Sequence, residues 1–377
     1  MINYPRTTNF QGAIYVGNWG TSNIPIYNVP NMHALNQLVG YIKHINAGNG
    51  TVLYRGQCQL YEKVSPSIKH EPEHIIENEV NLTSALNNIS QNADCLKFFG
   101  LNSPDIKGWE LYKHLVIEAV LQHYGAKTYS VDFVDNHWTA LWFGLYMWDK
   151  VNNKYILREP STKTEDWKYI DKNKSSFFDR TLPPKSTIED ISIFPETQQK
   201  IQKISASGNI SILDLEMRYK ETLLKRAFNE WKNNIQKKEK DNEKIDKIEN
   251  SEYLYIFLYV ADTNVSDIHG LYIGENTYTI DLRKILPSIF LRPSSQHGWI
   301  VKGKNQDYDF NSQIPCVIQI NIKLAKEMLG NGTLLSQENF FPNKTIDQGY
   351  RVLLERQVGS AKHPKLIPDG MIANFNE

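Results

Sequence analysis

Two short segments of the chain combine residue types that can grip an anionic nucleotide. The first, residues 54–57, reads Tyr-Arg-Gly-Gln and follows the β-branched and apolar start of a strand at residues 51–54. A guanidinium at the end of a buried strand can fork onto a phosphate or a carboxylate. The second segment begins at residues 122–125, Gln-His-Tyr-Gly. We interpret the pair as a nucleotide-handling site; the alternative is that Arg55 pairs with a buried acid.

The second segment continues into a polar strand and an aromatic-rich helix. Residues 128–133 alternate polar and apolar side chains, which predicts a half-exposed strand that carries Asp132. Asp135 or Asn136 can cap a helix predicted over residues 137–149. A polar strand that runs directly into an apolar helix suits the grasp of an anionic dinucleotide. The aromatic stripe of this helix is interpreted as core packing, and the alternative for His123 is a core histidine bonded to a backbone carbonyl.

Composition and charge restrict the classes of function. The 377 residues, 41% of them hydrophobic, predict one elaborated domain. Lysine plus arginine equals aspartate plus glutamate, at 42 each, so no field of the whole chain attracts nucleic acid or an anionic membrane. The N-terminus lacks the order of a secretion signal, and no apolar run approaches the roughly 20 residues of a bilayer span. We expect a cytoplasmic protein with no membrane partner.

Motifs of several other classes are absent or interrupted. Three scattered cysteines, Cys58, Cys95 and Cys316, indicate neither a disulfide framework nor a thiolate zinc site. Residues 70–74 fit His-Glu-x-x-His, but Pro72 breaks the helix turn that would bring both imidazoles together, so no metal is expected. The chain has no phosphate loop and no strand-linked Gly-x-Gly-x-x-Gly, so ATPase and dehydrogenase classes lack support.

Hydrophobic periodicity predicts an α+β framework for these segments. Helices are expected at residues 32–45, 73–96, 109–122 and 324–329. Strands are expected at residues 253–261 and 316–322, in a hairpin that joins 271–273 to 278–280, and at Trp299 after a polar turn. A helical first part is thus followed by a β-rich second part, rather than by alternating units.

Residues 150–250 are expected to form an insertion. Its first part is rich in lysine, aspartate, serine and proline and predicts an irregular surface segment. Residues 212–248 predict a long helix whose second half, 232–249, is almost wholly charged. One interpretation is a solvated helix with Glu/Lys support pairs, and the other is an arm that docks a partner or a nucleic acid backbone.

Several separated blocks resemble, in the same order, the FRG domain, a family named for a Phe-Arg-Gly motif. The blocks are residues 54–57, 66–68, 109–111, 122–125 with Thr128 and Asp132, 140–143 and 292–298. The resemblance covers roughly residues 35–320. It implies one domain over residues 1–320, interrupted by the insertion, with residues 321–377 as an extension packed on it. Tyr54 replaces the usual Phe of the family, and Tyr129 stands where an Arg is frequent.

The order of the FRG blocks is similar to that of ADP-ribosyltransferases, and this similarity implies a split β-sheet core and NAD as co-substrate. Arg55, Gly56 and Gln57 would then bind the NAD pyrophosphate. His123 and Tyr124 would contact the ribose or stack on nicotinamide, and Asp132 would be the electrostatic or basic residue. Two residues of the last block complete the implied site: Gln296 would hold the ribose hydroxyl or orient the acceptor, and Arg292 would contact a phosphate or the target.

The resemblance implies transfer of ADP-ribose from NAD to a macromolecule, without a metal. The expected acceptor is a nucleic acid, with RNA slightly favoured over DNA, or a protein. The expected setting is a bacterial toxin of a toxin-antitoxin or anti-phage defence system, with an antitoxin protein as partner. Because Gln296 stands where these transferases carry an acid, two alternatives stay open: an NAD glycohydrolase, and a non-catalytic module that binds a nucleotide or RNA.

Overall fold

The computed structural model describes residues 2–19, 23–102, 108–149, 154–158, 170–171, 252–265, 267–332 and 334–373. Of the predicted insertion at about 150–250, only two short strands are described. The helix expected over 212–248, with its charged half at 232–249, lies outside the described residues.

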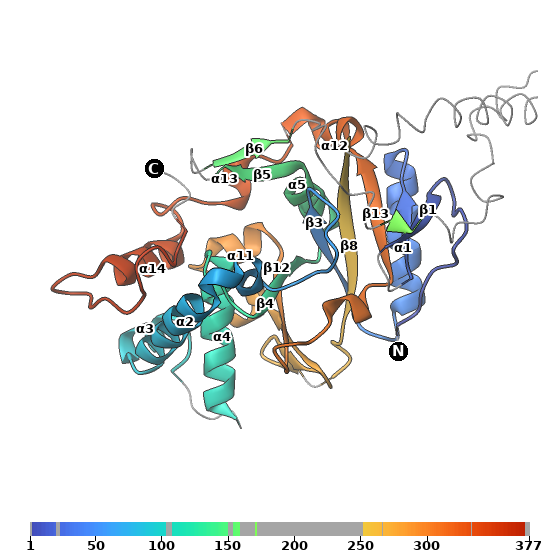
Figure 1. Cartoon of the computed structure of the whole chain (residues 1–377). Coiled ribbons are helices and arrows are strands. Elements are labelled where there is room, and N and C mark those ends of the chain that lie inside the picture. Colours follow the sequence, from blue (N-terminus) through green and yellow to red (C-terminus); the bar gives the residue numbers. More distant parts are fainter. Residues whose placement is uncertain are drawn as a thin grey trace, which may run out of the picture.

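A mixed sheet of eleven described strands runs through the protein (Figure 1), in the order β7-β1-β2-β13-β8-β3-β4-β12-β11-β10-β9. In chain order these strands are β1 (Ile14–Trp19), β2 (Ile24–Asn28), β3 (Thr51–Gln57), β4 (Ser130–Val134), β7 (Ile170–Asp171), β8 (Tyr253–Ala261), β9 (Asp267–Ile268), β10 (Leu271–Ile273), β11 (Thr277–Asp281), β12 (Gly298–Gly303) and β13 (Cys316–Asn321). The pair of β2 and β13 is parallel, whereas β8 is antiparallel to both of its neighbours. The strand predicted at residues 253–261 is confirmed as β8, which lies in the interior of the sheet.

The strand β8 illustrates how the sequence produces a sheet that is buried on both faces. Successive side chains of a strand point to opposite faces. Leu254, Ile256, Leu258 and Val260 therefore join the larger apolar cluster, which they share with the helices. The alternate side chains, from Tyr255 to Ala261, join a second cluster, which residues 60–64 and 310–314 cover from the other side. Helices on one face and irregular segments on the other make this an α+β protein, as predicted.

The sheet nearly divides between β3 and β4. These strands pair through Tyr54 and Val134 alone. On either side the ladders are long: β3 pairs with β8 over seven residues, and β4 pairs with β12 over five. Beyond Tyr54 the two strands therefore separate, with Arg55 on one side of the opening and Asp132 on the other.

The helices gather mainly on one face of the sheet and at its end (Figure 1). Those described are α1 (Met32–Asn46), α2 (Ile75–Ser90), α3 (Ala93–Phe98), α4 (Trp109–His123), α5 (His137–Leu145), α10 (Leu282–Ile285), α11 (Leu291–Ser295), α12 (Ile322–Met328), α13 (Gln337–Phe340) and α14 (Gln348–Val358). Short 3-10 turns lie at η2 (Ser67–His70), η3 (Pro72–His74), η7 (Phe310–Gln313) and η8 (Gly330–Gly332). No helix within the described ranges has both the length and the apolar character needed to cross a bilayer.

Local sequence signals explain the bounds of the two helices that flank the opening. The α4 helix ends at His123, and Gly125 follows with a positive φ of 113°, which a residue without Cβ adopts readily. The α5 helix begins after Asn136, whose side chain accepts a hydrogen bond from the Trp138 amide at 2.9 Å.

Three expectations about secondary structure were wrong. The helix predicted over 137–149 ends at Leu145, because Tyr146–Asp149 forms strand β5 and pairs with β6 (Lys154–Leu157). The residues of β6 lie outside the segment whose periodicity predicted the helix. The helix predicted over 73–96 is broken near Asn92, whose side chain caps α3. The segment expected to be a polar turn before Trp299 is helical over Leu291–Ser295, where it forms α11, and only Gln296 and His297 form a turn before the strand. Strands β1 and β2 add β structure to the part of the chain that was expected to be helical.

Candidate functional site

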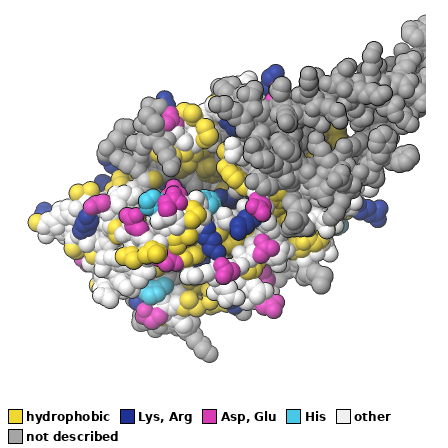
Figure 2. Space-filling model, viewed as in Figure 1, with side chains coloured by type: hydrophobic (Ala, Val, Ile, Leu, Met, Phe, Trp, Pro, Cys, Tyr) yellow, Lys and Arg dark blue, Asp and Glu magenta, His cyan; other side chains and the backbone are white. Residues whose placement is uncertain are grey.

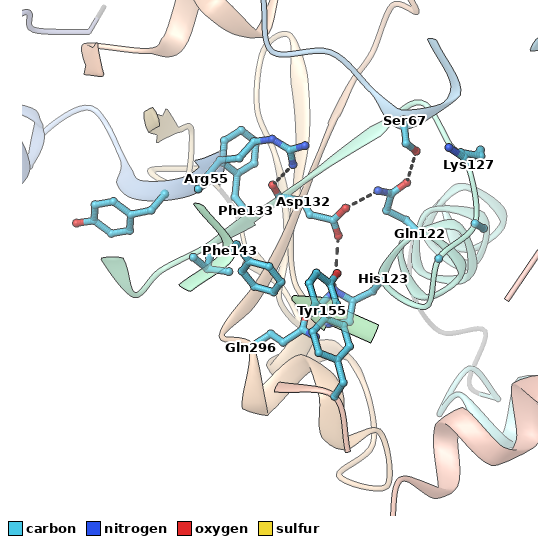
Figure 3. A pocket seen from close by; sticks show the side chains of 16 residues that line it. Arg55, Ser67, Gln122, His123, Lys127, Asp132, Phe133, Phe143, Tyr155 and Gln296 are labelled. Atoms are coloured by element: carbon cyan, nitrogen blue, oxygen red, sulfur yellow. Dashed lines mark hydrogen bonds and ion pairs between the residues drawn. The ribbon is translucent and has the colours of Figure 1, made fainter. Parts of the chain in front are cut away.

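A cavity of about 380 Å³ opens where β3 and β4 separate (Figure 3). Its walls come from segments far apart in the sequence: the end of β3, the end of α4, strand β4, helix α5, and residues near 155, 296 and 341. Four of the predicted site residues line it with their side chains: Arg55, His123, Asp132 and Gln296. Parts of the sequence blocks at residues 54–57, 122–132 and 292–298 therefore line one cavity.

Arg55 lies at the boundary of this cavity. Its Nη1 donates a hydrogen bond to the main-chain oxygen of Asp132 at 2.8 Å. Within the described part of the chain, its buried Nε has no hydrogen-bond partner and the guanidinium forms no ion pair with a carboxylate. Burial lowers the pKa of Arg55, an effect that the nearby Asp132 opposes. A desolvated cation without a carboxylate partner favours the binding of an anion.

Asp132 and His123 form the acidic and basic pair of the cavity. The distance from His123 Nδ1 to Asp132 Oδ1 is 3.6 Å. The His123 side chain is only 4% exposed, whereas the Asp132 side chain is 39% exposed. The carboxylate is therefore open to a ligand, and the imidazole lies behind it. The buried Nε2 of His123 makes no hydrogen bond within the described residues. Among the described residues, the ring therefore does not make the bond to a backbone carbonyl that the core-histidine alternative requires.

Gln122 holds the other oxygen of Asp132. Its Nε2 donates a hydrogen bond to Asp132 Oδ2 (Figure 3). Its Oε1 lies 3.3 Å from Ser67 Oγ and 2.5 Å from Thr128 Oγ1, and both hydroxyls donate to it. Gln122 was part of the sequence block but was given no role, because no pattern in the sequence tells which face of the helix end meets β4.

Aromatic rings form the apolar wall of the cavity. The rings of Tyr155 and Phe341 are stacked with centroids 4.7 Å apart, and Phe143 meets Tyr155 edge-on at 6.5 Å. Gln296 lies beside this wall (Figure 3), and its Nε2 donates to the Phe340 carbonyl oxygen at 2.8 Å. Planar groups pack well on such rings. Tyr155 and Phe341 lie outside the blocks that the sequence singled out, and only the tertiary structure brings them here.

A second hollow, of about 540 Å³, adjoins the first and shares Arg55, Gly56 and Phe143 with it. Gln57 and the side chains of Lys63, His70 and Trp148 also line it. Burial lowers the pKa of His70, and the Arg55 charge lowers it further. On the face shown in Figure 2, basic, acidic and apolar side chains are interspersed, so this face carries no single basic patch.

Gly56 has a packing role that the sequence did not indicate. A Cβ at this position would lie 1.7 Å from the carbonyl oxygen of Ala140, so only glycine lets α5 approach β3 this closely. Gly56 also borders both hollows. The helix contact alone is sufficient to explain why glycine is required.

Two of the predicted ligand contacts, Tyr124 and Arg292, are fully buried and do not line the cavity. The Tyr124 hydroxyl donates to Asp347 Oδ2 at 2.8 Å. The Arg292 guanidinium lies between the rings of Tyr124 and Tyr350, at 4.5 Å and 4.6 Å from their centroids. Both residues support the end of α4 from behind, and direct contact with a ligand does not fit this position.

In the described residues, no group of three or more histidine, cysteine, aspartate or glutamate side chains is arranged to hold a metal ion. Comparisons with protein-family models, with curated proteins and with solved structures found no match to this chain.

Proposed function

We propose that this protein is an NAD-dependent ADP-ribosyltransferase that modifies a macromolecule. One observation carries the proposal. The guanidinium of Arg55, without a carboxylate partner in the described residues, lies between two adjoining hollows, one of which contains the accessible carboxylate of Asp132. A dinucleotide has the matching order of groups: two nucleoside halves joined by an anionic diphosphate.

The diphosphate of NAD would lie at Arg55, which can offer its remaining Nη hydrogens to phosphate oxygens. The nicotinamide ribose would enter the smaller hollow, where Phe143, Tyr155 and Phe341 give the pyridine ring a flat apolar wall. The adenosine half would enter the larger hollow beside Trp148 and Lys63. Arg55 thus separates the two halves of the same ligand.

The chemistry follows from the position of Asp132. When the bond between ribose C1′ and the nicotinamide nitrogen breaks, its electron pair leaves with nicotinamide, and positive charge develops on the ribose. A fixed carboxylate stabilises that charge more in the transition state than in the ground state, and so accelerates the step. The nucleophile of the acceptor then bonds to C1′ and gives its proton to Asp132 or, through it, to His123.

Gln296 would orient the ribose rather than stabilise its charge. Its Nε2 is already bonded to the Phe340 carbonyl oxygen, which leaves Oε1 to accept a hydrogen bond from a ribose hydroxyl. A neutral amide supplies no electrostatic stabilisation of an oxocarbenium-like state, so the proposal assigns that role to Asp132.

For the acceptor we propose nucleic acid, RNA ahead of DNA, with protein as the other class. Exposed aromatic side chains favour unstacked bases, and Tyr61 at the larger hollow is 46% exposed, so it can contact a base of the acceptor while the adenosine half of NAD lies beside Trp148. A toxin of a toxin-antitoxin or anti-phage defence system, held in check by an antitoxin protein, is the biological setting that we propose. One observation favours an NAD glycohydrolase as the second candidate: the 39% exposure of Asp132 lets water reach the same position.

The test is to incubate the purified protein with adenylate-labelled NAD and separate pools of RNA, DNA and cell protein. The Asp132→Asn variant keeps the shape of the side chain and removes its charge. The matched control is Asp307→Asn, at a fully exposed carboxylate that contacts Lys69 outside the cavity. We expect the wild type and Asp307→Asn to label one pool, and Asp132→Asn to label it at least about 100-fold more slowly.

Each other outcome has a defined meaning. Free nicotinamide without labelled polymer would replace the transferase with the glycohydrolase. Intact NAD in every tube would overturn both, and calorimetric titration with NAD would then show whether the hollows bind a nucleotide without turnover.

A further inference from the structure

We propose that Gln122 is the positioning residue for Asp132, and that Ser67 and Thr128 fix the direction in which its amide group faces. The hydrogen-bond arrangement stands on the geometry alone, and its consequence for turnover rests on the proposed function. The arrangement joins three elements: the turn η2, the end of α4 and the segment that enters β4.

The direction of the Gln122 amide follows from the hydrogen atoms of its neighbours. The Thr128 amide donates to Ser67 Oγ at 3.2 Å, and the Ser130 amide donates to Thr128 Oγ1 at 3.0 Å. Each hydroxyl therefore accepts one bond from the backbone and still has its own hydrogen to donate. Both hydrogens can be used on Gln122 Oε1.

The opposite direction of the amide is unfavourable. If the group were flipped, Oε1 would face Asp132 Oδ2 and two acceptors would meet without a hydrogen between them. In the direction found, Oε1 accepts from two hydroxyls and Nε2 donates to the carboxylate. Gln122 Oε1, both hydroxyls and Asp132 Oδ2 then each have a partner, and a buried polar network with paired groups is rigid.

Burial protects this arrangement from water. Gln122 is 8% exposed and Thr128 is fully buried, so solvent does not compete for the bonds of the amide. Asp132 Oδ2 is held by Gln122, while Oδ1 lies toward His123 and the carboxylate as a whole stays partly open. One carboxylate oxygen is thus held in place by Gln122. This fixes the orientation of the whole carboxylate, which must face the positive charge that develops on the ribose.

A purely structural role for the Gln122 side chain has little support at the helix end. The end of α4 is closed by backbone bonds: the Tyr124 amide donates to the Val120 carbonyl, and the Gly125 amide donates to that of Gln122. The side chain is not needed for the cap. Its bonds go to Asp132 and to the two hydroxyls that direct it.

The first arm of the test needs no turnover. Side-chain amide signals of ¹⁵N-labelled protein are measured by NMR, with Gln122→Met used to assign the Gln122 pair. The reference is Gln37, a half-buried glutamine of α1 whose side chain makes no hydrogen bond within the described residues. We expect the Gln122 amide hydrogens to exchange with water at least about tenfold more slowly than those of Gln37, and the Ser67→Ala/Thr128→Val double variant to remove most of that difference.

The second arm measures turnover of NAD. Gln122→Met should lower kcat by about 10- to 100-fold with little change in KM, since a misplaced group costs rate rather than binding. Gln122→Glu should regain activity only at low pH, because a glutamic acid donates to Asp132 only while it is protonated. Gln37→Met is the control and should match the wild type. A change that only loosened the fold would not produce this dependence on pH.

The two arms separate the failure of this inference from the failure of the proposed function. Gln122 amide hydrogens that exchange as fast as those of Gln37, or an active Gln122→Met variant with the kcat of the wild type, would overturn the inference. Slow exchange in a protein that leaves NAD intact would support the positioning arrangement and refute the transferase.

Discussion

The imidazole of His123 occupies the space that a side chain at Gly298 would need. A Cβ at Gly298 would lie 2.8 Å from His123 Cε1 and 3.3 Å from Nε2. Strand β12 begins at Gly298 and pairs with β4, so the first residue of one strand leaves room for the ring that faces Asp132 on the next. Gly298, to which the resemblance assigned no role in the site, thus determines where the ring of His123 can lie.

We predict that Gly298→Ala displaces His123 and lowers turnover of NAD. The ring is almost wholly buried, so it can shift only against its neighbours, and this overpacking should also cost about 1–3 kcal/mol of unfolding free energy. The control is Gly40→Ala in α1, where a Cβ meets nothing within 4 Å and where alanine should stabilise the helix by roughly 0.5–1 kcal/mol. Urea unfolding and a turnover assay of both variants provide the check. Equal activity of Gly298→Ala and the wild type would contradict the prediction.

We predict that Arg55→Met abolishes binding of NAD without destabilising the fold. The guanidinium is desolvated and has no carboxylate partner in the described residues, so relief of its burial should offset the loss of its hydrogen bond to the Asp132 carbonyl oxygen, and an apolar side chain of similar length should change the free energy of unfolding by less than about 1 kcal/mol. Isothermal titration with NAD and thermal unfolding measure the two effects separately. A large loss of stability together with unchanged binding of NAD would show that Arg55 serves the fold instead.

We predict that Tyr124→Phe, unlike Arg55→Met, destabilises the fold and leaves the binding of NAD unchanged. The Tyr124 hydroxyl donates to Asp347, a fully buried carboxylate that also accepts bonds from the Arg292 and Tyr350 amides at 3.1 Å and 2.9 Å. Removing one donor should cost about 1.5–3 kcal/mol of unfolding free energy and leave the affinity for NAD unchanged. Denaturant midpoints and calorimetry check this, with Tyr4→Phe, at a tyrosine 49% exposed, as the control. Loss of NAD affinity in a folded Tyr124→Phe variant would restore the ligand contact expected from the sequence.

Stability should depend on pH through His137. Burial, and to a lesser extent the charge of Lys43, lowers the pKa of His137 from 6.5 to about 4. Between these values the unfolded chain binds a proton that the folded protein does not bind, so stability falls as the pH drops from about 6.5 to about 4. After allowance for solvent screening we expect a loss of about 1–2 kcal/mol. Urea unfolding at pH 7 and pH 4.5 measures the loss, and His137→Phe should reduce it. A loss of the same size in His137→Phe would exclude His137 as its source.

Elements with a strong local pattern were predictable from the sequence. The helix expected over 32–45 extends over Met32–Asn46, and the expected hairpin pairs Leu271 with Ile280 and Ile273 with Tyr278. The helix predicted over 137–149 failed where the structure depends on a distant partner. Tyr146 and Trp148 continue a helical aromatic stripe, but their backbone pairs with β6, and no local pattern encodes that pairing.

The candidate site was predictable in part, for the same physical reason. Arg55, His123, Asp132 and Gln296 stand out by residue type within their segments, and the structure brings them to one cavity. Tyr124 and Arg292 have equally suitable chemistry, but burial against Asp347 and Tyr350 depends on the C-terminal part of the chain. The type of a side chain can be read from the sequence, whereas the direction in which it points depends on packing.

The single contact between β3 and β4 creates two strand edges inside a sheet. Beyond Tyr54 and Val134 the facing backbones lack each other as partners, and unpaired strand edges are normally sites of aggregation. Here the Arg55 side chain replaces one missing hydrogen bond between the strands, because its Nη1 donates to the Asp132 carbonyl oxygen as a backbone amide would. One guanidinium therefore satisfies a carbonyl oxygen of this internal strand edge, while its remaining Nη hydrogens stay available.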